Sequence, residues 1–557
     1  MNLILIVSNL MFMEKNKIKL FLTLILVYLF FVQWYGWNEQ SHFSLTRAIV
    51  EEKRFEIDSY ANQTGDRSFY KNHYYTDKNP GLSFLASPIY LAWSFIYNFF
   101  PQDFKQNYSG DNRFVTELQD TVAIFTYIDP GFFTFSAMIF LTFFLSSIFT
   151  ALTAVLIYKI SKHYTTEKYS LLVALAYGIG TIAFINALHF MSHSLATFLS
   201  FFPFFILFTQ KDAGWKKFGL AGILAGFAMV VDQLNLLIAL PLLFYAFYVN
   251  KKKSILFLSG LIIGVMPLLI YNFLNFDHPL TLALVHIDRN IFKTASPETF
   301  SFSGENVEEK FFKASFDLTG ILKVFHFKPN SNPYIMLRLL FYPYRGLFVY
   351  SPILFLSFIG MVFMLKKHRA ELILILFILF SFLYFISMRS SWWGGYCFGP
   401  RYLLPVVPFL TFPIAFIFKK HRSKLFLILI LSLVFLSIFI NSLGLQPAEE
   451  DIYDWRTMGV KNEDMINSFH VILNPLEYHY FPNFLKYGPR SWVFESLIND
   501  FISIDIRVNP ISKGSNFPFS KFFVPFLCLV PIFFIVLLVW SREALDATKK
   551  IFKVIRR

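Results

Sequence analysis

The sequence predicts an all-α polytopic membrane protein with about twelve transmembrane helices. Hydrophobic residues make up 55% of the 557 positions and charged residues only 15%, and the mean hydropathy is +0.52. Many apolar runs are about 20 residues long, which is the length that a helix needs to cross a bilayer. The runs lack the alternation of a membrane barrel, so helices are the structure that satisfies their backbone in lipid. They lie at residues 20–37, 131–158, 169–188, 193–210, 217–231, 233–249, 254–275, 346–365, 370–388, 402–418, 424–441 and 521–540.

The basic residues predict how these helices are oriented. The net charge is +14, but the lysines and arginines form no single patch, so nucleic acid is not an expected partner. They cluster in every second connection between spans, as cytoplasmic segments do. This pattern places both termini in the cytoplasm of a cell-membrane protein. The clusters are Lys15/Lys17/Lys19, Lys159/Lys162/Lys168, Lys211/Lys216/Lys217, Lys251/Lys252/Lys253, Lys366/Lys367/Arg369, Lys419/Lys420/Arg422/Lys424 and the tail after Arg542.

A long first loop, residues 38–130, then lies outside the cytoplasm. Within it, residues 82–100 are apolar enough to span, but a stripe at helical spacing is polar: Ser83, Ser87, Tyr90, Ser94 and Tyr97. This pattern predicts an interfacial helix that lies on the membrane. The other outer segments are 276–345, 389–401 and 442–520. We expect 442–520 to be a small folded segment of unassigned role, and 521–557 to be the last helix and a basic cytoplasmic tail.

The ionisable residues gather at the predicted outer ends of the spans, whose centres are almost free of charge. A coupled transporter usually carries charged groups near the midplane. The pattern therefore favours a reaction at the outer membrane surface. A flippase or transporter of a lipid-linked glycan is the alternative, and a scaffold that docks partners through 442–520 is a third hypothesis. The outer-end residues are Glu39, Asp58, Asp77, Lys78, His189, His193, Asp232, Arg345, Arg389 and Arg401.

Several stretches resemble the C-type (GT-C) glycosyltransferase superfamily, which includes protein O-mannosyltransferases and the lipid A aminoarabinose transferase. They are Glu39 with HFSLTRAIVEE (42–52), Asp77-Lys78-Asn79-Pro80, RGLFVYSP (345–352) and WWGGYCFGPRYLLPVVP (392–408). The resemblance implies that 1–441 is a transmembrane catalytic module. It would move a sugar from a polyprenyl-phosphate donor to a protein, lipid or glycan acceptor on the extracytoplasmic face. Members of the superfamily open the first loop with Asp-Glu, whereas this chain has Asn38-Glu39.

Two carboxylates are candidates for the general base that deprotonates an acceptor hydroxyl. Glu39 lies at the mouth of the first span, and Asp58 follows in FEIDSY. A base of this kind would give a single displacement with inversion at the anomeric carbon. The structural alternatives are a carboxylate at a helix N-terminus for Glu39 and a turn residue for Asp58.

Three basic residues are candidates for binding the lipid phosphate. Lys78 stands beside a Pro-Gly turn, where its ammonium suits a phosphate as a point charge. Arg345 and Arg401 each follow turn-forming sequence at the outer start of a span, where a guanidinium could bind phosphate with two donors. Anchoring at the membrane interface is the alternative for both arginines.

A divalent metal ion could assist, although the sequence does not require one. By resemblance, Asp77 would help to hold it. His189 and His193 are four residues apart and would share a face if one helix contained both. The alternatives are a surface ion pair for Asp77 and hydrogen bonding at the interface for the histidines. Asp232, between two spans, either caps a helix or lines the site.

Overall fold

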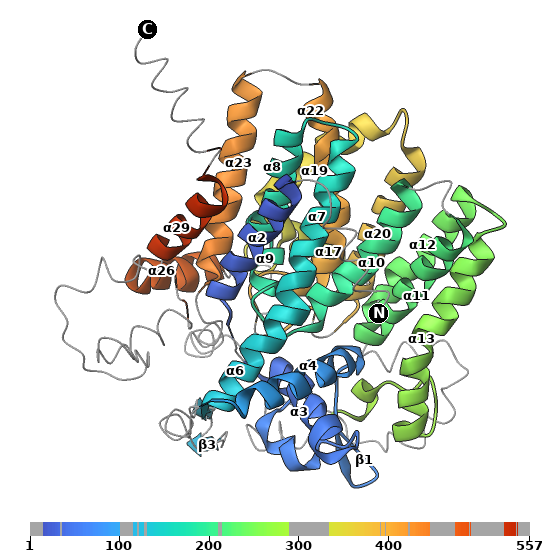
Figure 1. Ribbon diagram of the computed structural model, residues 1–557, viewed down its shortest axis with the longest axis vertical. Helices are drawn as coiled ribbons and strands as arrows, with labels where there is room; N and C mark the ends of the chain where they lie inside the picture. Colours follow the sequence, from blue (N-terminus) through green and yellow to red (C-terminus); the bar gives the residue numbers. More distant parts are fainter. Residues whose placement is uncertain are drawn as a thin grey trace.

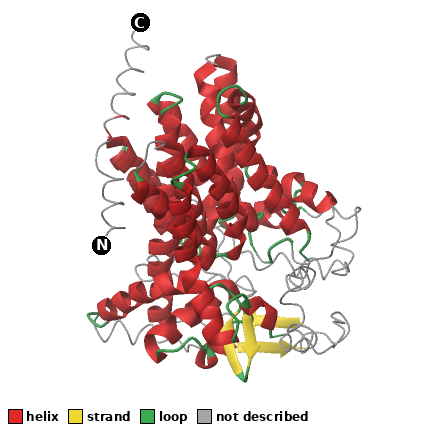
Figure 2. Cartoon of the chain, turned by 90° about the vertical axis from the view of Figure 1, so that its right-hand side faces the viewer, coloured by secondary structure: helices red, strands yellow, loops and turns green. Residues whose placement is uncertain are grey.

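The chain forms a bundle of helices with the first loop gathered at one end. The computed structural model describes residues 15–33, 36–100, 115–119, 122–126, 131–209, 214–288, 333–389, 392–395, 397–420, 424–445, 474–489, 491, 529–541 and 543. The long helices stand side by side, and α3, α4 and β1 lie below them in Figure 1. The two hairpins of the first loop lie at this same end (Figure 2).

Every predicted span overlaps a helix or consecutive helical segments, although residues 521–528 of the last span lie outside the described residues. In chain order these are α2 (Lys15–Phe30); α6 (Gly131–Thr142), η3 (Phe143–Ser147) and α7 (Ile148–Lys162); α8 (Glu167–Gly180) and α9 (Ala183–Asn186); α10 (Ser192–Thr209); α11 (Trp215–Val231); η4 (Gln233–Asn235) and α12 (Leu236–Val249); α13 (Ser254–Phe276); α18 (Leu347–Tyr350), η6 (Pro352–Leu354) and α19 (Phe355–Met364); α20 (Arg369–Ser387); η7 (Arg401–Val406), α21 (Val407–Thr411), η8 (Phe412–Phe416) and α22 (Ile417–Lys420); α23 (Lys424–Leu443); and α29 (Leu529–Val539).

The predicted number of twelve spans is not confirmed. Among the described residues, five helices are long and apolar enough to cross a membrane: Phe133–Lys162, Ser192–Thr209, Ser254–Phe276, Arg369–Ser387 and Lys424–Leu443. Other apolar helical segments are shorter, and proline explains the short pieces of one of them. Pro405, Pro408 and Pro413 divide Arg401–Phe416 into short 3-10 and α-helical pieces, because proline lacks the amide donor of a continuous helix. The sides of the membrane and the positions of the termini remain predictions.

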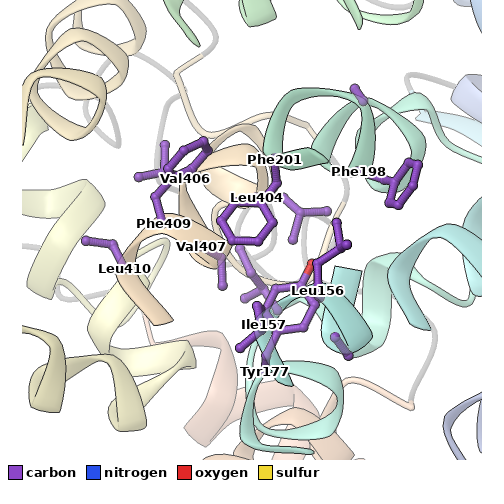
Figure 3. Packing of buried hydrophobic residues seen from close by; sticks show 14 of the residues in the cluster. Leu156, Ile157, Tyr177, Phe198, Phe201, Leu404, Val406, Val407, Phe409 and Leu410 are labelled. Carbon is purple, nitrogen blue, oxygen red and sulfur yellow. The ribbon is translucent and has the colours of Figure 1, made fainter. Parts of the chain in front are cut away.

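Helix α10 is the centre of the bundle. Every residue from Ser192 to Phe208 is buried, as expected for a helix that is surrounded by others. Figure 3 shows Phe198 and Phe201 of this helix among side chains of α7, α8, η7 and α21. The labelled neighbours are Leu156, Ile157, Tyr177, Leu404, Val406, Val407, Phe409 and Leu410. A side chain at the N-terminal end of α10 is therefore held by a rigid element.

Helices α11 and α13 pack closely through glycine. Gly222 and Gly226 on α11 face Gly260 and Gly264 on α13, and a Cβ atom added at any of the four would overlap the backbone of the opposite helix. Small residues four apart let helix backbones approach in this way in membranes. The packing fixes the C-terminal end of α11, where Asp232 follows.

The first loop is not entirely helical, and the all-α prediction is wrong to this extent. After α3 (Trp37–Arg47), η1 (Ala48–Glu52) and η2 (Asp58–Gln63), strand β1 (Arg67–Tyr70) pairs antiparallel with β2 (His73–Thr76). Lys71 and Asn72 between them have φ angles of 48° and 67°, which suit a two-residue hairpin turn. Further along, β3 (Val115–Gln119) pairs with β4 (Val122–Thr126). The first hairpin ends directly before Asp77.

The helix expected at 82–100 is present as α4 (Gly81–Tyr97), and its polar stripe faces the protein. Ser83 Oγ donates to the His42 carbonyl, and Tyr90 OH donates to Glu51. Leu91 and Phe95 on the other face are 58% and 65% exposed. This distribution suits an apolar environment outside the helix. Its place at the membrane surface remains a prediction.

The remaining elements lie between or after the spans. They are η5 (Ala283–His286), α17 (Pro333–Phe341), η10 (Leu476–Tyr480) and α26 (Phe481–Tyr487). Within the segment 442–520, Tyr480 is fully buried and its ring meets the ring of Phe398 at 5.1 Å. The rest of that segment, apart from 442–445, 474–489 and 491, lies outside the described residues, as does the basic tail.

Candidate functional site

A pocket of about 500 Å³, including the space at its mouth, lies where the first loop meets the bundle. It brings together three of the predicted site residues that are far apart in the chain, Lys78, His193 and Arg401. Asp77 and Asp232 line it as well. We call it the Lys78–Arg401 pocket. The remaining lining residues are Asn38, Asn79, Ser192, Val231, Gln233, Leu234, Leu284, Arg389 and Tyr402.

The Asp77-Lys78-Asn79-Pro80 turn is fastened to the end of α11. Asn79 Nδ2 donates to the Met229 carbonyl at 2.8 Å. Gly81 lies so close to α11 that an added Cβ atom would be 2.6 Å from the backbone of Val230. These contacts explain why asparagine at position 79 and glycine at position 81 suit this turn. They also place Lys78 beside Asp232, which follows α11.

Lys78 is held between two carboxylates. Its Nζ lies 2.8 Å from Asp66 Oδ2 and 3.0 Å from Asp77 Oδ2. Burial alone would lower the pKa of Lys78, but the charges of Asp66 and Asp77 raise it above its usual value. Lys78 is therefore a fixed positive charge at the wall of the pocket.

Asp77 carries an oxygen that no described residue uses. Its side chain is buried, and its Oδ1 has no hydrogen-bond partner, whereas Oδ2 accepts from Lys78. Burial raises the pKa of Asp77 to about 6; the Lys78 charge acts in the opposite direction, and Asp66 adds to the rise. A buried acceptor without a partner is costly, so this oxygen is a natural contact for a ligand.

Two arginines share the ring of Tyr402 on another wall of the pocket. The guanidinium carbon of Arg389 lies 4.8 Å from the ring centre and that of Arg401 lies 5.5 Å from it. Neither arginine forms an ion pair with a described residue. Arg401 is 9% exposed, contacts Met191 Sδ at 3.6 Å, and leaves its Nε without a partner. Two neighbouring positive charges that form no ion pair among the described residues favour an anionic ligand.

The loop before Arg401, of which residues 392–395 and 397–400 are described, packs against the Arg401 side chain. Gly394, Gly395 and Gly399 have φ angles of 81°, 70° and 68°, which glycine adopts without strain. A Cβ atom on Gly394 would lie 3.4 Å from the Arg401 side chain, so the backbone runs against the arginine. The WWGG and FGPR sequences therefore shape the surroundings of this side chain.

Arg345 lies behind that loop and does not line the pocket. Its guanidinium donates to the carbonyls of Trp393, Tyr344 and Gly395 at 3.0 to 3.1 Å, and the residue is 2% exposed. These bonds engage all three of its nitrogens, and the buried side chain does not reach the pocket lining. In this structure Arg345 holds the loop that surrounds Arg401.

His193 and Asp232 form a buried pair at the pocket. His193 Nδ1 lies 3.1 Å from Asp232 Oδ2, and the other oxygen of Asp232 accepts the backbone N–H of Leu234. Asp232 thus caps η4 and lines the pocket at the same time. Burial alone would raise the pKa of Asp232, but the bonds from His193 and Leu234 and the nearby charge of Arg389 keep it below its usual value.

The other predicted acid and base residues lie outside the pocket lining. Glu39, in the first turn of α3, is 1% exposed and its Oε1 lies 3.0 Å from His189 Nδ1. Asp58 lies in the hairpin region, where its Oδ1 accepts from the Tyr74 amide and its Oδ2 bonds His73 Nδ1. Asn38, next to Glu39, does line the pocket.

The predicted metal ligands are not gathered around one point. His189 lies between α9 and α10, so no helical turn connects it with His193. The two histidines bond different carboxylates, and the described residues contain no group of three metal-ligating side chains that could hold an ion. The arrangement does not fit a centre built from Asp77, His189 and His193 together.

Sequence reasoning missed several polar groups near this pocket. Asp66 orients Lys78 but stands eleven residues before Asp77 in an unremarkable turn, and the pairing of β1 with β2 brings it there. His42 is fully buried on α3, and neither of its ring nitrogens is bonded by a described residue. Burial lowers the pKa of His42 to about 3, and the charges of Lys78, His193 and Arg401 act in the same direction. The sequence signal that could have identified His42 was its position in the HFSLTRAIVEE stretch.

The fold and the site together define a helical protein with membrane-length apolar helices and a cation-lined pocket at one end of the bundle. No protein-family model matches the chain, and no curated protein matches it.

Among solved structures, the chain is similar to the apo crystal structure of the Archaeoglobus fulgidus oligosaccharyltransferase, with 12% sequence identity and a TM-score of 0.39. The match covers 80% of this chain and 57% of that one, so it spans little more than half of the archaeal protein. A TM-score of this size does not establish a common fold.

Proposed function

We propose that the chain is a membrane glycosyltransferase that moves a sugar from a polyprenyl-phosphate donor to an acceptor. The observation that carries the proposal is that Arg389 and Arg401 share one tyrosine ring in a pocket that Lys78 also lines, and that neither arginine forms an ion pair with a described residue. These three cations outnumber the two carboxylates of the lining, Asp77 and Asp232, so the pocket keeps a net positive charge that a phosphate would balance. Arginine donors match phosphate oxygens, and they would stabilise the charge that develops on the leaving phosphate.

An apolar surface next to the pocket suits a lipid tail. Gln233 and Leu234 line the pocket and directly precede α12. On that helix, Leu236, Leu240 and Phe244 follow at intervals of four residues and are 40%, 45% and 73% exposed. An isoprenoid chain could lie along this stripe with its phosphate in the pocket. The acceptor hydroxyl then attacks the anomeric carbon from the side opposite the phosphate, which inverts the configuration of that carbon.

The geometry leads us to keep some of the predicted residue roles and to reassign others. Lys78 and Arg401 keep their proposed contact with phosphate, and Arg389 joins them. We assign Arg345 to the support of the loop around Arg401. Glu39 and Asp58 do not line the pocket, so the proton acceptor is sought among the groups that do. A divalent ion, if one takes part, would use the unpartnered Asp77 Oδ1. The extracytoplasmic location of the reaction belongs to the proposal.

Purified full-length protein in detergent, given a panel of polyprenyl-phosphate sugars, tests the reaction class. We expect release of free polyprenyl phosphate from at least one donor, and loss of this release in Lys78→Ala and Arg401→Ala. Lys71→Ala is the matched control, because Lys71 pairs with Asp277 at an exposed site away from the pocket. Intact donors throughout the panel, or transfer of donors across vesicles without cleavage, would overturn the proposal.

A further inference from the structure

We propose that the His193–Asp232 pair, rather than Glu39 or Asp58, receives the proton of the acceptor hydroxyl. This inference rests on the proposed glycosyl transfer. It names the residue that acts in that reaction and the residue that positions it. The proposal is carried by the position of His193. It lines the pocket, and its Nδ1 is bonded to Asp232, a carboxylate that is itself fixed by capping η4.

The pair determines which nitrogen of His193 faces the substrate. An ionised carboxylate can only accept hydrogen bonds, so His193 Nδ1 carries the proton that lies between it and Asp232 Oδ2. The lone pair of the ring is then on Nε2. No described residue bonds Nε2, and this atom is not fully enclosed by protein. Because His193 lines the pocket, Nε2 is the ring nitrogen that an acceptor there could reach. A neutral imidazole in this tautomer is a proton acceptor.

Asp232 is held by more than its contact with His193. Its Oδ1 accepts from the Leu234 amide at 3.0 Å, and its carbonyl accepts from Asn235 Nδ2 at 2.9 Å. Asn235 in turn accepts from Ser200 on α10, the helix that carries His193. The carboxylate and the imidazole are therefore fixed to each other through two elements of the bundle. Such support keeps a proton acceptor in one orientation.

The surroundings separate this pair from the similar pair of His189 and Glu39. Both pairs have a buried carboxylate bonded to Nδ1, but His193 and Asp232 line the pocket with Arg389 and Arg401, whereas His189 and Glu39 do not. The Tyr402 ring that contacts both arginines also meets the His193 ring edge-on at 6.0 Å. The proton acceptor and the cations that would hold the phosphate thus flank one aromatic side chain.

The proposed step is balanced as follows. The acceptor oxygen forms a bond to the anomeric carbon while its proton passes to His193 Nε2. The bond from the anomeric carbon to the phosphate oxygen breaks, and its electron pair stays on the phosphate. Arg389, Arg401 and Lys78 lie around the charge that the phosphate gains. Asp232 stabilises the imidazolium, which then loses its proton to water and restores the neutral ring.

Kinetics of the purified full-length enzyme, with a donor that the wild type cleaves, test this assignment. His193→Asn keeps an amide near the position of Nδ1 that can still bond Asp232, but it offers nothing at Nε2. A role limited to holding Asp232 would therefore survive in H193N. We expect instead a fall in kcat of about 10²-fold to 10⁴-fold with the donor KM within about threefold of wild type.

Asp232→Asn and His286→Gln complete the experiment. D232N favours the wrong tautomer of His193 and should also lower kcat by at least about 10²-fold. His286 is a half-buried histidine that packs on Tyr70 and Phe276 and does not itself line the pocket, so H286Q should retain wild-type kcat. Thermal midpoints confirm that each variant is folded.

The outcomes separate the two proposals. A wild type that cleaves its donor while H193N and D232N keep near-normal kcat would overturn the role of the pair alone. The same conclusion follows if Glu39→Gln removes turnover and H193N does not. A wild type that cleaves no polyprenyl-phosphate sugar would overturn the proposed function and this assignment with it.

Discussion

Lys78 Nζ lies 2.8 Å from Asp66 Oδ2, although Asp66 is outside the DKNP motif that contains the lysine. The hairpin of β1 and β2 returns the chain so that Asp66 meets the end of β2. The backbone is fixed there as well, because the Ser41 hydroxyl bonds both the Asp66 carbonyl and the Thr76 hydroxyl. Asp66 thus determines where the ammonium of Lys78 is held.

Asp66→Asn should weaken donor binding without unfolding the protein. The variant leaves Lys78 with Asp77 as its one carboxylate partner, so the ammonium turns toward Asp77. We expect the donor KM to rise roughly fivefold, because a partly exposed ion pair contributes a binding free energy of this order. The change in kcat should be smaller. Asp277→Asn, in the exposed pair with Lys71, is the control. An unchanged KM in D66N would show that Asp66 does not orient Lys78 for the donor.

Arg345 and Arg401 should respond differently to replacement by lysine. Arg345→Lys leaves carbonyls of Tyr344, Trp393 and Gly395 without donors, since one ammonium cannot reproduce the planar fork. A fully buried carbonyl left unpaired costs about 1–3 kcal/mol. These carbonyls are partly buried, so each costs less, but the loss of three bonds should still lower the thermal midpoint. Arg401→Lys should keep the midpoint, because Arg401 forms no ion pair with a described residue, but should lose most turnover. The reverse pattern would contradict the roles given to the two arginines.

The sequence predicted the helical positions well because an apolar run of bilayer length has one structural solution. It also named Lys78, His193 and Arg401, which the structure brings to one pocket. It did not predict that Asp66 joins Lys78, because that contact depends on strand pairing between short polar segments. His189 and His193 looked equivalent by spacing, but the break before α10 separates them. Arg345 and Arg401 also looked alike, and only the course of loop 392–400 distinguishes them.

Helix packing next to the pocket depends on glycine in α11. A side chain at Gly222 would overlap the Phe257 carbonyl of α13, and one at Gly226 would overlap that of Leu261. Overpacking of this kind costs about 1–3 kcal/mol or more, because backbone must move. Gly222→Ala should therefore lower the thermal midpoint and, by shifting the end of α11, reduce turnover. Gly214→Ala is the control, because an added Cβ there meets nothing within 4 Å. Equal midpoints for the two variants would contradict the close packing of α11 on α13.

Asp77 should make stability fall as the pH rises through the mildly acidic range. Its pKa is about 6 in the folded chain because the carboxyl is buried, against 3.8 for an unperturbed aspartate. Between these values the folded state holds a proton that the unfolded state has released. Stability therefore decreases with increasing pH there, by at most about 3 kcal/mol. The Asp77→Asn variant lacks this proton, so its thermal midpoint should change less than that of the wild type between pH 4 and pH 7. The difference between D77N and wild type should grow in favour of D77N toward pH 7. Parallel midpoint curves for the two proteins would show that Asp77 ionises as it does in water.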